Sequence, residues 1–83
     1  MKIVKITEAK YIDNYKIQFQ FNTNETKVID FKAFLRNTPY NNEKKYLNLE
    51  NFQKFRVEMG DLIWNDYDMC FQAKNLYKNI LRK

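Results

Sequence analysis

The sequence has 83 residues, enough for one domain expected to span residues 1–83, and its net charge is +5. It contains no histidine, one cysteine (Cys70) and one glycine (Gly60). These counts exclude zinc clusters, cysteine–histidine catalysis, intramolecular disulfides and glycine-rich phosphate loops.

The first third of the chain predicts three strands. Residues 3–12 are rich in Ile, Val and Tyr and are expected to form the first strand. Residues 15–21 carry the clearest pattern, because Tyr, Ile and Phe alternate with Lys and Gln. Residues 26–30 form the third expected strand. Polar turn residues separate the three segments, which predicts an antiparallel meander.

A helical spacing replaces the strand pattern after the meander. Phe31, Phe34 and Leu35 lie at positions i, i+3 and i+4, which predicts one or two helical turns with Asp30 as the N-cap. Residues 36–45 are mostly polar, and we expect them to form a loop.

A second short helix and a hairpin are expected next. Asn48 is a suitable N-cap for the helix. Apolar and polar residues alternate before Gly60-Asp61, the apolar run Leu62-Ile63-Trp64 follows it, and Gly60-Asp61 itself predicts a two-residue type II′ turn. In that hairpin Val57 is expected to lie opposite Trp64.

The last expected element is an amphipathic helix. Its apolar stripe is spaced i, i+3, i+4 and i+7, and it consists of Ala73, Leu76, Tyr77 and Ile80. The predicted fold class is therefore α+β, an antiparallel β-meander plus a β-hairpin, with short helices on one face and an amphipathic C-terminal helix.

Three carboxylates near the predicted hairpin are the only candidates for chemistry. Asp61, Asp66 and Asp68 could hold Mg²⁺ or act as an acid–base pair if they converge. The alternative, which we favour, is that they are turn residues and that Asp68 caps the last helix. We therefore expect no catalytic residues, no metal and no cofactor.

Candidate interaction residues lie in the same region. They are Trp64, Tyr67 and Asp68, although core packing is the favoured alternative for the tryptophan. Cys70, beside Met69 and Phe71, is expected to be a buried apolar residue rather than a nucleophile. A lone cysteine, no apolar run of about 20 residues and no signal peptide favour a cytoplasmic protein.

The order of these elements resembles a bacterial family catalogued as domain of unknown function 2442. The resemblance rests on Asp13-Asn14-Tyr15, Phe19-Gln20-Phe21, Val28-Ile29-Asp30-Phe31, Phe52, Phe55, Leu62-Ile63-Trp64, Asp68-Met69 and Leu76-Tyr77. It implies a small α+β fold and no known enzymatic activity. Some relatives are similar to small proteins encoded in pairs suspected to be toxin–antitoxin modules.

Two functions follow as hypotheses. The first is a non-enzymatic protein-interaction module, the antitoxin-like partner of a small protein encoded nearby. The alternative is a nucleic-acid-binding or transcription-associated accessory domain, which the basic net charge and the abundant tyrosines favour. No membrane partner is expected.

Overall fold

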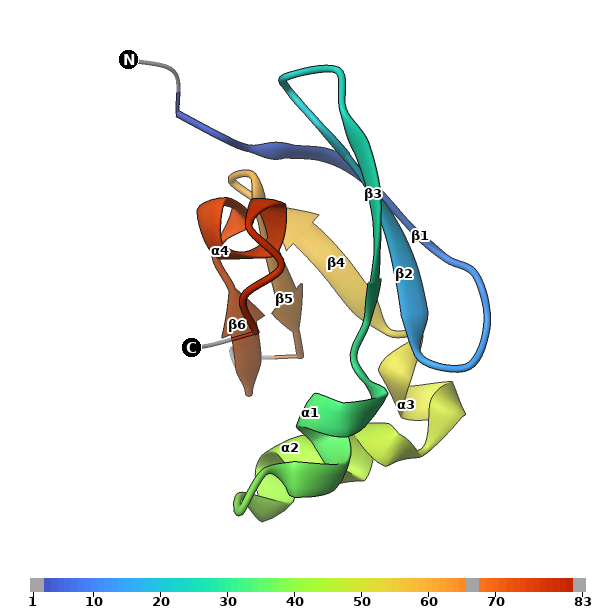
Figure 1. Cartoon of the computed structure of the whole chain (residues 1–83). Helices are drawn as coiled ribbons and strands as arrows, with labels where there is room; N and C mark the ends of the chain where they lie inside the picture. The colour runs from blue at the N-terminus through green and yellow to red at the C-terminus, as the bar shows by residue number, and fades with distance from the viewer. Residues whose placement is uncertain (1–2, 66–67, 82–83) are drawn as a thin grey trace.

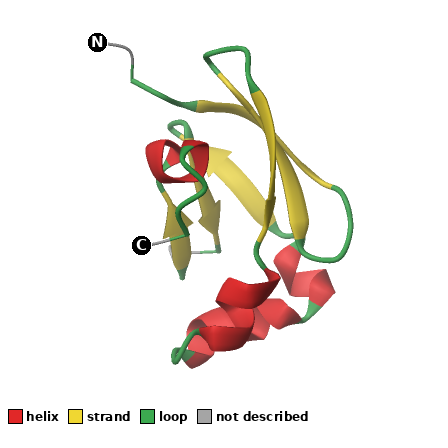
Figure 2. Cartoon of the chain, in the orientation of Figure 1, coloured by secondary structure: helices red, strands yellow, loops and turns green. Residues whose placement is uncertain are grey.

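The computed structural model describes residues 3–65 and 68–81, which form two three-stranded antiparallel sheets and several short helices (Figures 1 and 2). The first sheet contains β1 (Ile6–Tyr11), β2 (Lys16–Phe21) and β3 (Thr26–Asp30). The second contains β4 (Phe55–Glu58), β5 (Asp61–Trp64) and β6 (Met69–Phe71). The helices are α1 (Lys32–Asn37), α2 (Asn41–Lys44), the 3₁₀ helix η1 (Lys45–Leu47), α3 (Leu49–Phe52) and α4 (Ala73–Tyr77). The predicted α+β class is confirmed.

The meander is confirmed, with β2 between β1 and β3. Ile17, Phe19 and Phe21 of β2 are buried, and the polar residues between them lie on the opposite, wetter face. The first strand is shorter than the predicted 3–12, because the segment before Ile6 leaves the ladder. There Asn22 contacts Lys5 twice, because its N–H donates to the Lys5 carbonyl at 2.9 Å and its side chain accepts from Lys5 N at 3.0 Å.

The polar stretch 36–45 is not the loop that we predicted, because α1 extends to Asn37 and α2 follows after three residues. The Thr38 hydroxyl accepts the N–H of Tyr40 at 3.3 Å and donates to the carboxylate of Glu43, which together fix the start of α2. The helix α1 starts one residue later than predicted, although Asp30 does accept the N–H of Lys32 at 2.9 Å.

The cap predicted for the second short helix is confirmed. The Asn48 side chain accepts backbone N–H groups of Glu50 at 2.9 Å and Asn51 at 3.4 Å, at the start of α3. Helices α1, α2 and α3 lie together at one end of the molecule, whereas α4 lies apart from them beside the second sheet (Figure 1).

The hairpin forms with a different turn from the one predicted. Its loop residues are Met59 and Gly60, with φ of 53° and 87°, so that Glu58 pairs with Asp61. Positive φ at both central positions is the type I′ geometry, whose twist matches that of the strands. The shift also changes the register, and Trp64 pairs with Phe55 rather than with Val57.

The third strand of this sheet, β6, was not predicted, because three residues are too few to show a period. It pairs with β5 and buries Met69 and Phe71. The final helix α4 is also shorter than the predicted stripe. Asn79, with φ of 59°, ends it, and Ile80 N bonds back to Asn75 O at 2.7 Å in a Schellman-type cap.

Aromatic side chains from both sheets and α3 form the centre of the core. Trp64 is 0% exposed and makes ring contacts with Phe31, Phe52 and Phe71 at centroid distances of 5.5–5.9 Å. A backbone bond from Ile6 N to the Gly60 carbonyl, 2.9 Å long, joins the two sheets. Among the described residues no helix is long and apolar enough to cross a membrane.

Candidate protein-interaction site

Of the three predicted interaction residues the structure describes Trp64 and Asp68, and these two do not form one surface. Trp64 belongs to the core, as the alternative interpretation held. Tyr67 lies outside the described residues. Asp68 remains, and its carboxylate is occupied by three neighbours: Lys45 Nζ at 2.6 Å, Asn65 Nδ2 at 3.0 Å and the Tyr46 hydroxyl at 3.2 Å.

The contacts of Asp68 give it a structural role. The hydrogen bonds from Asn65 and then from Lys45 lower the pKa of Asp68 to about 2. Burial, followed by the hydrogen bond to Asp68, raises the pKa of Tyr46 to about 12. The carboxylate thus joins η1 to the segment before β6. The prediction that Asp68 caps the last helix is wrong.

The other carboxylate of the hairpin supplies that cap instead. Asp61 Oδ1 accepts the N–H of Ala73, the first residue of α4, at 3.0 Å. Asp61 and Asp68 lie at opposite ends of β5, and Asp66 lies outside the described residues. Within 3–65 and 68–81 no group of three or more His, Cys, Asp or Glu residues could hold a metal ion.

Cys70 is partly buried on β6 rather than fully buried as expected. Burial, followed by the negative charges of Asp61 and Glu58, raises the pKa of its thiol. Because the thiolate is the reactive form, this environment opposes nucleophilic chemistry.

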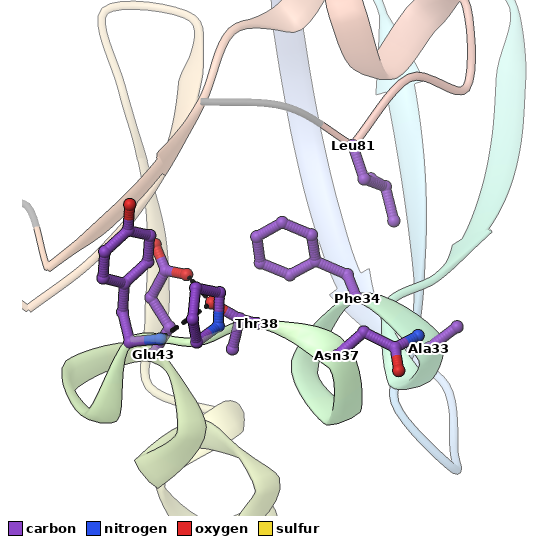
Figure 3. Close-up of a pocket in the computed structure, with 8 residues that line it drawn as sticks. Ala33, Phe34, Asn37, Thr38, Glu43 and Leu81 are labelled. Carbon is purple, nitrogen blue, oxygen red and sulfur yellow. Dashed lines mark hydrogen bonds between the residues drawn. The ribbon is translucent and has the colours of Figure 1, made fainter.

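An apolar pocket opens at the helical end of the molecule, between α1, the turn into α2, and the segment after α4 (Figure 3). Its volume is about 460 Å³. The lining is mostly apolar and consists of Ala33, Phe34, Asn37, Thr38, Pro39, Tyr40, Glu43 and Leu81. Pockets of this size, apolar with a few polar groups, are typical of binding sites.

The walls of the pocket are held by contacts with the core. The Phe34 ring lies edge-on against the buried Phe71, with centroids 5.2 Å apart. Thr38 and Glu43 are bonded to each other, and Glu43 is only 1% exposed. Tyr40 at the rim is 57% exposed. Side chains that are already held in place before binding lower the entropy that binding must overcome.

The two helices that contribute to the pocket carry exposed basic residues. Arg36 and Lys44 are exposed on α1 and α2, and neither forms an ion pair within the described part of the chain. The one acidic residue of these two helices, Glu43, is buried. The two helices therefore carry exposed positive charge and no exposed negative charge.

A second depression, of about 380 Å³, is polar. It is lined by Lys45, Tyr46, Asn51, Lys54, Arg56 and Asn65. Two of its cations have carboxylate partners, because Lys45 pairs with Asp68 at 2.6 Å and Arg56 pairs with Glu58 at 3.1 Å. The two carboxylates neutralise part of the positive charge that the lining residues bring to this depression.

The apolar pocket was missed because most of its lining residues lie in the stretch 36–45, which was interpreted as a polar loop. The only signals in the sequence were the apolar spacing that includes Phe34 and the exposed aromatic Tyr40. The family described as "Protein of unknown function (DUF2442)" matches residues 6–82. No curated protein and no solved structure matches the chain.

Proposed function

The chain belongs to the DUF2442 family of proteins of unknown function, and we propose that it is a non-enzymatic protein-interaction module. The observation that carries the proposal is the apolar pocket between α1, α2 and Leu81, with Tyr40 exposed at its rim. Exposed aromatic residues beside a preformed pocket are the usual anchors of protein interfaces.

The kind of partner follows from the chemistry of the pocket. A volume of about 460 Å³ accepts one large apolar side chain or two smaller ones. Arg36 and Lys44, exposed on the same two helices, favour acidic residues next to that anchor. We propose a partner that presents an apolar anchor flanked by Asp or Glu.

The biological setting that we propose is a two-gene pair in the cytoplasm. The partner is then a small protein encoded beside this gene, and this domain is the antitoxin-like member. A partner of opposite charge fits the net charge of +5, because complementary charge speeds and orients association.

Co-expression tests this proposal. The chain is produced together with the tagged product of the adjacent gene, and the complex is isolated through the tag. We expect stoichiometric co-purification of the wild type, and reduced recovery of Tyr40→Ala. The control is Leu49→Ala, which also removes an exposed apolar side chain (40% exposed) but outside the pocket. Equal recovery of both variants would reject the pocket as the docking site.

Nucleic-acid binding is the second candidate, and the polar depression around Lys54 and Arg56 favours it. Such binding weakens steeply with salt because phosphate contacts release counterions. Titrating fluorescent single-stranded and duplex DNA at low and physiological salt distinguishes the two functions. A steep salt dependence whose slope falls by about one in Lys54→Ala would support the nucleic-acid function instead.

A further inference from the structure

The backbone bonds of β3 show which of its residues face β2. One bond runs from Phe21 N to Glu25 O and is 2.9 Å long. Another runs from Phe31 N to Tyr15 O and is also 2.9 Å long. In an antiparallel ladder, residues alternate between those that exchange hydrogen bonds with the partner strand and those that point away from it. The odd-numbered residues of β3 therefore bond to β2.

The even-numbered residues, Thr26, Val28 and Asp30, consequently direct their N–H and C=O groups away from the sheet. Within the described part of the chain these six backbone groups form no hydrogen bond. The side chains of all three residues are exposed, and the Val28 side chain is 53% exposed. An unpaired strand edge is a template for a further strand.

Two of the usual protections of a sheet edge are missing from β3, although the strand is short and carries Lys27 and Asp30. The strand contains no proline, and its register with β2 has no bulge. An inward-pointing lysine often guards an edge. Lys27 does not guard the edge of β3, because its ammonium group is held against Tyr77. Its Nζ donates to the Tyr77 carbonyl at 2.8 Å and lies 4.3 Å from the centroid of the Tyr77 ring.

We propose that β3 pairs with β3 of a second copy of this chain, in antiparallel orientation about a two-fold axis at Val28. In this register Val28 meets its own copy, Thr26 meets Asp30, and Lys27 meets Ile29. All the outward-facing backbone groups of the strand find partners, and no two like charges lie opposite each other. The same residues serve both copies, as a two-fold interface requires.

The self-pairing is weak and depends on salt. A five-residue strand buries less than the roughly 1,200–2,000 Å² typical of stable complexes. Each copy also carries a net charge of +5, and salt screens the resulting repulsion. Association therefore increases with protein concentration and with ionic strength, opposite to the salt response of nucleic-acid binding.

Sedimentation equilibrium of the purified chain tests the pairing. We expect the weight-average mass to rise from 10.2 kDa toward twice that value between micromolar and millimolar protein. Val28→Pro removes the central N–H, which has no partner within the chain, so it should fold and remain monomeric. Val28→Thr keeps the N–H and the β-branch and should associate like the wild type.

A second variant keeps the test decisive if Val28→Pro fails to fold. Val28→Lys places two ammonium groups opposite each other, which should weaken association by up to about fivefold at low salt. A wild-type chain that stays at 10.2 kDa at millimolar concentration and high salt would overturn the proposal. So would association of Val28→Pro and Val28→Lys equal to that of the wild type. Neither result bears on the pocket at α1 and α2, which belongs to other elements.

Discussion

The indole Nε1 of Trp64 donates a hydrogen bond to the carbonyl of Phe52, 2.8 Å away, in the centre of the core. This carbonyl belongs to the last residue of α3, where helix carbonyls have no partner within the helix. The bond therefore ties the second sheet to the group of helices that carries the pocket.

Replacing Trp64 by Phe should be strongly destabilising. The phenyl ring keeps most of the apolar contacts but leaves the buried Phe52 carbonyl unpaired, which alone costs about 1–3 kcal/mol. Urea unfolding followed by circular dichroism measures the loss. Leu49→Ala, at an exposed position, should change the unfolding free energy by less than about 0.5 kcal/mol. Similar losses for the two variants would contradict the role given to the bond.

Asp61 should stabilise α4 through its bond to Ala73 N. Asp61→Ala removes the acceptor and is expected to cost about 1 kcal/mol of unfolding free energy, the usual value of a helix cap. Asp61→Asn keeps a side-chain oxygen and should retain most of that stability. Asp13→Ala, at an exposed turn, is the matched control. If the alanine and asparagine variants unfold alike, the cap is not what Asp61 contributes.

Asp68 should make stability depend on acid pH. Its pKa is lowered from 3.8 to about 2 in the folded chain, so the folded state favours the carboxylate. The stabilisation is fully present above about pH 4 and is lost as the pH falls through the window toward 2. Asp68→Asn should lack this contribution, so its unfolding free energy should approach that of the wild type as the pH falls.

Urea unfolding of both proteins at a series of acid pH values measures this difference. Protonation of the remaining carboxylates affects the two proteins equally and cancels in the comparison. Stability curves that run parallel from pH 5 to pH 2 would show that Asp68 has no lowered pKa.

The spacing of apolar and polar residues along the sequence explains which elements could be predicted. In β2 the alternation of apolar and polar residues is complete, because one face of the meander is buried and the other is wet. The helices after residue 36 have no such pattern. The start of α2 depends on a bond between the Thr38 hydroxyl and the buried carboxylate of Glu43. The sequence does not show that this polar side chain will be buried.

The candidate site was less predictable than the fold for the same reason. The pocket joins α1 and the turn after it to Leu81, and only tertiary packing brings these segments together. The carboxylates near the hairpin were visible in sequence, but their partners were not. Asp61 and Asp68 serve a helix cap and a hydrogen-bonded cluster at opposite ends of one strand.

Calorimetric titration of the purified product of the adjacent gene into this chain tests the central claim most directly. Tyr40→Ala removes an exposed aromatic anchor and should weaken binding by about 2 kcal/mol, or about 30-fold. Ala33→Arg fills the pocket without adding negative charge and should also weaken binding. Leu49→Ala should bind like the wild type. Equal affinities for all four proteins, or no heat of binding with the wild type, would contradict the proposal that the pocket docks a protein partner.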